Sequence, residues 1–209
     1  MTRAEAEKKA LTFLNTGKKD HDLKLYQDAF EFEYGWIFSY NHAAVFDPRL
    51  EELQNRLSQL KASKVKEQAV LLTQQDLLQV MTEEEVAVLT NSAGSVGNRP
   101  VFVDRNTGEI TYVNSLYQEA FVAEICQQKT GIEKSWQLFL NYDFKGDKAK
   151  ASALKTYFEL TATEVFQWIK KAKNGEPILE YDLMEDMIVD RDRLEGLGFS
   201  IFVQEQIKT

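Results

Sequence analysis

Hydrophobic and polar positions alternate so regularly from Phe30 to Tyr40 that every even-numbered residue is aromatic. The run reads F-E-F-E-Y-G-W-I-F-S-Y. Side chains alternate between the two sides of an extended backbone, so one straight strand would collect all six rings on one face. A helix would scatter them around its circumference. We therefore predict a β segment with one strongly apolar face, in which Gly35 marks a bulge or bend.

The segment before this run predicts a helix and a short strand. Apolar spacing favours a helix from Arg3 to Asn15, with Thr2 and Glu5 as a capping box and Gly17 as its end. Leu23 to Tyr26 has the pattern of a strand.

A hairpin is predicted further along the chain. Pro100 to Asp104 and Glu109 to Val113 read as strands, and the turn residues R-N-T-G separate them. Together these elements predict an α+β fold, an antiparallel sheet with the N-terminal helix packed on one face.

A helical insertion is predicted at about residues 43–96, between two strands of the sheet. Leucines recur at helical spacing after Asp47-Pro48. The run from Gln74 to Asn91 is one further helix, or two if Thr82 and Glu85 form a capping box.

Residues 1–130 are expected to form the first domain, ending in a helix over Ser115 to Lys129, and residues 131–209 a second, small α/β sandwich. The second domain begins with a strand over Trp136 to Tyr142. A helical stretch follows, which we expect to break near Thr161 to Thr163, with Thr163 capping its second half. The remaining elements are a short extended piece, a helix and a strand, predicted over Pro177 to Tyr181, Met184 to Leu197 and Phe199 to Val203.

Composition and charge narrow the function classes. The chain has 209 residues, 44% of them hydrophobic, and a net charge of −8, which argues against nucleic acid as a direct partner. No stretch approaches the ~20 apolar residues of a membrane span, and the charged start M-T-R-A-E-A-E-K-K-A is not a secretory signal. With Cys126 as its only cysteine, the chain needs no oxidising compartment. We expect a cytoplasmic protein without membrane association.

Catalytic and cofactor motifs are not evident. The only histidines, His21 and His42, lack further metal ligands at suitable spacing and are expected on loops or the surface. Cys126 lies within a predicted helix and is expected to be a structural thiol. The glycines in S-A-G-S-V-G-N-R-P lack the strand-before, helix-after context of a phosphate loop, and G-x-S-x-G and H-E-x-x-H do not occur. We predict no enzymatic activity, no metal and no cofactor.

Charge is unevenly distributed in the last 65 residues. Seven lysines face three acids from Lys145 to Lys173, whereas eight acids face two arginines from Glu176 to Glu195. One interpretation is two solvated helix faces. The other is an acidic surface that docks a basic protein partner. The residues of this predicted docking surface are Glu180, Asp182, Glu185, Asp186 and Asp190.

Two stretches resemble the immunity protein 35 family, namely E-F-E-Y-G-W-I-F-S-Y-N and, downstream, G-N-R-P-V-F-V-D-R-N-T-G-E-I. The resemblance covers about residues 1–115, although the segment between the motifs is longer here and the C-terminal unit is an addition. It implies a small α+β module that acts by binding, as an antidote to a polymorphic bacterial toxin. The positions that match the family motif are Tyr34, Gly35, Trp36, Gly97, Pro100, Asp104, Thr107 and Gly108.

The element order of residues 131–209 is similar to that of the C-terminal domain of ribosomal protein L7/L12, which implies a protein-contact module. The leading hypothesis is thus a non-catalytic bacterial immunity protein that occludes a cognate toxin with a basic surface. A homo-oligomer is compatible with the sequence. The alternatives are a chaperone-like or scaffold protein without a toxin partner, and a small-molecule binder whose cavity is lined by Trp36 and Tyr40.

Overall fold

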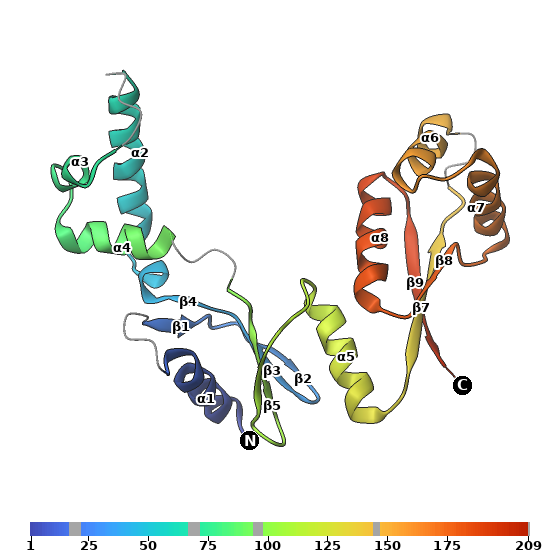
Figure 1. The fold of residues 1–209 in the computed structure, drawn as a ribbon, viewed down its shortest axis with the longest axis horizontal. Helices are drawn as coiled ribbons and strands as arrows, with labels where there is room; N and C mark the ends of the chain where they lie inside the picture. Colours follow the sequence, from blue (N-terminus) through green and yellow to red (C-terminus); the bar gives the residue numbers. More distant parts are fainter. Residues whose placement is uncertain (17–21, 67–71, 94–97, 144–146, 209) are drawn as a thin grey trace. The chain divides into compact units, whose positions relative to one another are not determined.

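The computed structural model describes residues 1–16, 22–66, 72–93, 98–143 and 147–208. The chain divides into two compact units, Met1–Val113 (unit 1) and Asn114–Thr209 (unit 2). Each combines helices with an antiparallel sheet, which confirms the α+β class (Figure 1).

Unit 1 is built on a four-stranded antiparallel sheet in the order β2-β3-β5-β6, and β1 pairs separately with β4. The predicted N-terminal helix and its Thr2–Glu5 capping box are confirmed. Gly17, its predicted end, lies outside the described residues. The elements, in chain order, are α1 (Arg3–Asn15), β1 (Leu23–Leu25), β2 (Phe30–Phe32), β3 (Gly35–Phe38), β4 (Tyr40–His42), η1 (Ala43–Phe46), α2 (Leu50–Lys66), α3 (Gln74–Leu78), α4 (Glu83–Ala93), β5 (Val101–Asp104) and β6 (Ile110–Tyr112).

The prediction that one face of the aromatic run carries all six rings is wrong, because the run folds into a hairpin. Glu33 and Tyr34 form a two-residue turn that places Phe32 opposite Gly35 and Glu31 opposite Trp36. Cross-strand partners share a face, so this turn pairs even-numbered residues of β2 with odd-numbered residues of β3. The even-numbered rings of the two strands therefore lie on opposite faces of the sheet.

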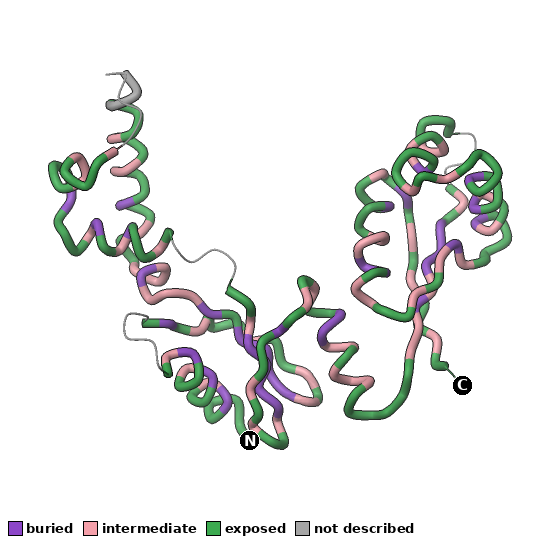
Figure 2. The backbone as a smooth tube through the Cα atoms, in the orientation of Figure 1, coloured by how far each residue is buried: buried purple, intermediate pink, exposed green. Residues whose placement is uncertain are grey.

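The rings of β3 form the core with α1. Trp36 and Phe38 are each 1% exposed and pack with Ala6, Ala10 and Leu14 of the helix. On the opposite face Phe32 lies 5.6 Å from the ring of Phe102, and Phe30 is 44% exposed. Buried stretches accordingly run along the central strands β3 and β5 (Figure 2).

The helical insertion lies between β4 and β5 and has a core of its own, formed by Leu53, Met81, Val86 and Leu89. Of the two alternatives for the second helical run, the structure shows two helices, α3 and α4. The Thr82 N–H donates to the Glu85 carboxylate at 2.7 Å, and the Glu85 N–H donates to the Thr82 hydroxyl at 3.3 Å. Residues 67–71 and 94–97 of the insertion lie outside the described residues.

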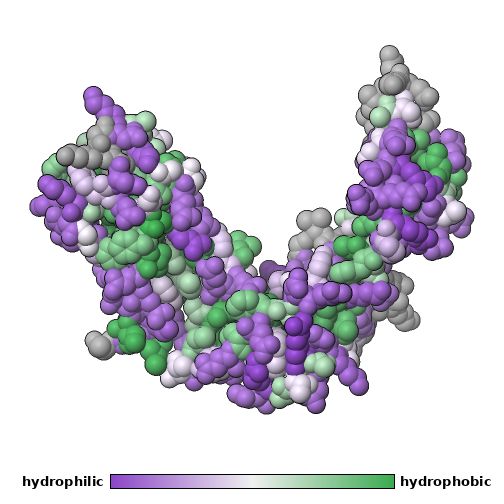
Figure 3. All heavy atoms as spheres, turned by 180° about the vertical axis from the view of Figure 1, so that it is seen from behind, coloured by the Kyte–Doolittle hydropathy of each residue, from purple (hydrophilic) through white to green (hydrophobic). Residues whose placement is uncertain are grey.

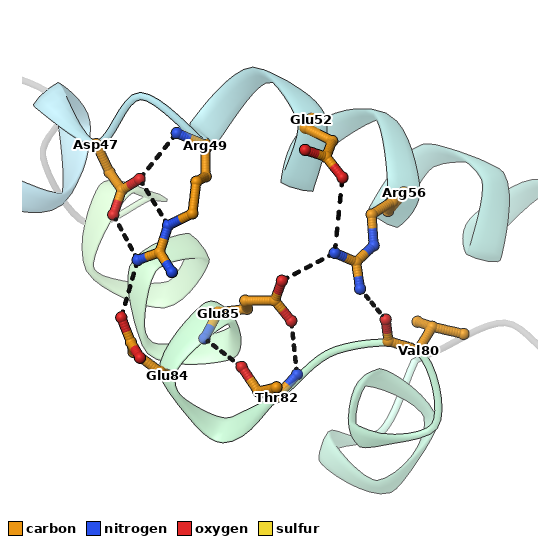
Figure 4. A network of polar contacts seen from close by, with 8 residues as sticks. All are labelled: Asp47, Arg49, Glu52, Arg56, Val80, Thr82, Glu84 and Glu85. Carbon is orange, nitrogen blue, oxygen red and sulfur yellow. Dashed lines mark hydrogen bonds and ion pairs between the residues drawn. The ribbon is translucent and has the colours of Figure 1, made fainter.

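Arg49, just before α2, and Arg56 of α2 connect the helices of the insertion (Figure 4). Arg56 donates to Glu85 at 2.9 Å and to the carbonyl of Val80. Arg49 donates to Asp47 and to Glu84, both at 2.9 Å. Hydrogen bonds from the Arg49 side chain and N–H lower the pKa of Asp47 to about 2. In the space-filling view, hydrophilic residues cover much of this part of the surface (Figure 3).

Unit 2 contains a three-stranded antiparallel sheet in the order β8-β7-β9. Leu138 and Leu140 of β7 pack with Leu154 of α6, Trp168 of α7 and Leu194 of α8, so the helices cover one face of the sheet. The elements are α5 (Gln118–Thr130), β7 (Lys134–Leu140), α6 (Lys148–Tyr157), α7 (Ala162–Asn174), β8 (Leu179–Tyr181), α8 (Met184–Gly196) and β9 (Ile201–Ile207).

Two details of unit 2 differ from expectation. Thr161, not Thr163, caps α7, because Thr161 forms a reciprocal capping box with Glu164. The division between the units lies after Val113 rather than after residue 130. Helix α5 belongs to unit 2 because Ala120 packs in a buried cluster with Trp136, Met187 and Ile188.

Candidate functional site

The two motifs that carry the family resemblance meet in adjacent strands of unit 1. Gly35 of β3 is the register partner of Asp104 of β5, and the Arg105 N–H donates to the Tyr34 carbonyl at 2.8 Å. A Cβ at position 35 would lie 2.2 Å from the carbonyl oxygen of Val103. Only glycine fits this approach, so Gly35 has a clear structural role.

Asp104 organises the turn after β5. It is 4% exposed, and its Oδ1 accepts the N–H groups of Asn106 and Thr107 at 2.9 and 2.8 Å. The Thr107 hydroxyl accepts the Glu109 N–H at 3.1 Å, and Gly108 has a φ of 71°. These contacts satisfy backbone donors of the turn and close the predicted hairpin.

The other motif residues also lie in the framework of the sheet. The Pro100 carbonyl accepts the Val113 N–H at 2.8 Å. The guanidinium of Arg105 lies 4.3 Å from the centre of the Trp36 ring and donates to Glu31 at 2.6 Å, which lowers the pKa of Glu31. Gly97 lies outside the described residues. The motif residues that the structure describes thus have a role in building the sheet.

The five acidic residues predicted to form a docking surface do not share one surface. The Glu180 carboxylate accepts a hydrogen bond from the Gln137 side chain at 2.9 Å. These two side chains lie on one face of the sheet, and the Tyr181 side chain lies on the other. Asp190 accepts the Tyr181 hydroxyl at 2.7 Å and a hydrogen bond from Arg193 at 3.1 Å. Burial, followed by this hydrogen bond, raises the pKa of Tyr181. Asp190 is therefore engaged within unit 2.

Asp182 and Glu185 come together at a small pocket between α5 and the start of α8. The pocket has a volume of about 120 Å³, and Glu124 of α5, which the sequence did not suggest, contributes a third carboxylate. Asp186 lies in the same first turn of α8 and is exposed, but it does not line the pocket. We call this site the acidic pocket. Its lining residues are Ser115, Ala120, Ala123, Glu124, Gln127, Trp136, Asp182, Leu183, Met184 and Glu185.

The acidic pocket combines negative charge with apolar surface. Trp136 is 4% exposed, whereas Leu183 is 63% exposed. No lysine or arginine belongs to its lining, and Lys208 pairs with Asp182 at 2.7 Å. That ion pair is solvent-exposed and therefore weak. Among the described residues, no group of three or more histidine, cysteine or acidic side chains is arranged to hold a metal ion.

Helix geometry explains part of this acidity. Leu183, the residue before α8, provides no side-chain cap, and Glu185 and Asp186 occupy the first turn, where the helix dipole favours negative charge. This stabilising role applies to Glu185 but does not account for Glu124 in the middle of α5.

Of the remaining candidates, His42 has a structural contact. The Nδ1 atom of His42 accepts the Ala44 N–H at 3.1 Å and so begins η1. Cys126 is half-buried within α5. His21 lies outside the described residues.

No family model, curated protein or solved structure matches this chain. None of the helices in the described part of the chain has the length and apolarity needed to cross a membrane.

Proposed function

We propose that this chain is a non-catalytic bacterial immunity protein that acts in the cytoplasm and neutralises a toxin by occluding it. The acidic pocket is the observation that best supports binding, because the carboxylates of Glu124 in α5, Glu185 in α8 and Asp182 just before α8 line it together with apolar side chains. The resemblance of residues 1–115 supplies the toxin class, and the net charge of −8 favours a basic partner.

The pocket is matched to a lysine or arginine of the toxin. A long basic side chain buries its aliphatic stem on apolar surface and keeps its charge near acids, which is the combination that Trp136, Met184 and the three carboxylates offer. At about 120 Å³ the pocket holds one side chain, so the rest of the interface lies on the surrounding surface.

The test is capture of the partner followed by rescue from toxicity. The full chain is used to recover its partner from native cells, and the partner is then produced alone and together with this chain in a host that lacks both. We expect growth arrest by the partner and its reversal by the chain. A partner that is harmless in this assay would reject the immunity role and favour a scaffold.

Charge reversal then tests the pocket. We expect Asp182→Lys combined with Glu185→Lys to weaken the affinity about tenfold or more, because two attractive charges become repulsive. Glu195→Lys, at an exposed acid of α8 outside the pocket, is the matched control. Equal affinity of both variants for the toxin would reject the pocket as the docking site.

A further inference from the structure

Strand β9 is unusual among the sheet edges of this protein. In the described part of the chain, the edge strands β1, β2, β4, β6 and β8 each have three residues, whereas β9 has seven. Its one strand neighbour there is β7. Short edges resist pairing with other chains, and a long edge invites it.

The register shows which backbone groups of β9 point away from β7. The Lys208 N–H donates to the Glu133 carbonyl at 3.0 Å, and the Ser200 carbonyl accepts the Asn141 N–H at 2.9 Å. Successive residues of a strand direct their N–H and C=O groups to alternate sides, so the even-numbered residues face β7. The outward groups are those of Ile201, Val203, Glu205 and Ile207.

Strand β9 also lacks the usual protection of an edge. It contains no proline, glycine or lysine, and its single charge, Glu205, is paired with Lys134 of β7 at 2.8 Å. Phe202 and Ile207 are 48% and 62% exposed. The other edge of this sheet, β8, follows Pro177 and carries Glu180 at its centre.

We propose that β9 binds the β9 strand of a second copy of this chain, antiparallel and centred on Gln204. In this register Val203 faces Glu205 of the other copy and Ile201 faces its Ile207. The backbone N–H and C=O groups of all these residues point away from β7, so each pair exchanges two hydrogen bonds. The two three-stranded sheets then join into one sheet of six strands.

The side chains favour a second copy over an unrelated strand. The centred register places Ile201 beside Ile207 on one face and Gln204 beside Gln204 on the other. It also keeps the two Glu205 carboxylates from facing each other, which a register centred on Glu205 would not. The strand thus pairs with a copy of itself through apolar contacts, with no like charges directly opposite each other. This inference is independent of the proposed immunity role.

Cross-linking tests the register. Two Gln204 residues at the centre would form a non-hydrogen-bonded pair with a Cα separation of about 4.5 Å, within the range that a disulfide bridges. In a Cys126→Ser background, we expect Gln204→Cys to form a covalent dimer under mild oxidation. Glu180→Cys, at an exposed site on the same face of the opposite edge, is the control. Equal cross-linking of the two variants would overturn the proposal.

Sedimentation equilibrium tests association without a cross-link. We expect the unmodified chain to form a dimer that Val203→Pro abolishes, since proline removes an outward N–H and leaves the bonds to β7 intact. Val203→Ala controls for loss of the side chain, and circular dichroism checks that each variant is folded. A chain that stays monomeric up to high micromolar concentration would overturn the proposal. If Val203→Pro does not fold, the comparison of cross-linking between Gln204→Cys and Glu180→Cys decides whether β9 pairs with a second copy.

Discussion

Gly35 and Asp104 lie opposite each other in the register of β3 and β5, where Gly35 meets a steric requirement and Asp104 a hydrogen-bonding one. A Cβ at Gly35 would meet the Val103 carbonyl oxygen at 2.2 Å and the Phe102 ring at 2.6 Å. We expect Gly35→Ala to destabilise unit 1 by about 1–3 kcal/mol, because the strands must separate to admit a methyl group. Native-state hydrogen exchange of β3 and β5 measures the loss.

Gly196→Ala is the matched control, since a Cβ there has no neighbour within 4 Å. Gly196 ends α8, so alanine should leave stability unchanged or raise it slightly. Similar exchange in β3 and β5 for the two variants would show that the sheet relaxes around position 35.

Asp104 allows a second prediction, about the turn after β5. Asp104→Ala removes the acceptor of two backbone N–H groups at a buried site, and we expect a loss of about 1–3 kcal/mol. Asp104→Asn keeps an acceptor oxygen and should cost less. The free energy of unfolding from urea titration distinguishes the two, and an equal loss would mean that negative charge, rather than hydrogen bonding, is required.

The half-buried Tyr181, which donates a hydrogen bond to Asp190, predicts that the free energy of unfolding depends on pH. The pKa of Tyr181 is raised above its ordinary value of 10.0, so the folded protein keeps a proton that the unfolded chain releases. The stabilisation that the protonated Tyr181 gives the folded state is fully present below about pH 10. It is lost as the pH rises further, by up to about 1.4 kcal/mol per pH unit. We expect Tyr181→Phe to be less stable than the unmodified chain by about 1 kcal/mol at pH 8, and the gap to narrow above pH 10.

Urea unfolding at pH 8, 9.5 and 11 measures this gap. Tyr157→Phe, at a tyrosine that is 54% exposed, controls for the general effect of alkali. A gap between the unmodified chain and Tyr181→Phe that stays constant with pH would contradict the prediction.

Arg56 of α2 and Arg49, just before it, are expected to contribute unequally to the stability of the insertion. The Arg56 side chain is 32% exposed and its partner Glu85 18%, whereas Arg49 and Glu84 are 44% and 75% exposed. We expect Arg56→Ala to destabilise the packing of α4 on α2 by about 1 kcal/mol, and Arg49→Ala to have a smaller effect. Hydrogen exchange in α4 compares them. A larger effect of Arg49→Ala would show that the link through Asp47 dominates.

Local signals in the sequence predicted most of the elements. Capping boxes at Thr2 and Thr82 placed helix starts correctly, because a cap depends on residues three positions apart. The hairpin from Phe30 was missed because Glu33-Tyr34 contains none of the usual turn residues, and the alternation of aromatic rings continues through it.

The acidic pocket was only half predictable. Asp182 and Glu185 stand out in an acidic block of the sequence, and the structure places both in the lining. Glu124 was missed because its role depends on α5 packing with α8, a tertiary relation for which the local sequence of α5 carries no signal. The length of β9 was underestimated because Gln204, Glu205 and Gln206 interrupt the apolar pattern at an edge.

The two ends of the insertion meet, since the Asn98 side-chain amide donates to the Asn41 side-chain oxygen at 3.4 Å. Strand β5, which follows the insertion, pairs with β3, which precedes it in the chain, and the helices of the insertion take no part in this pairing. The helical insertion between β4 and β5 is therefore a site for protein engineering. Its helices can be exchanged for a short loop or a reporter domain while the strand pairing of the sheet is kept.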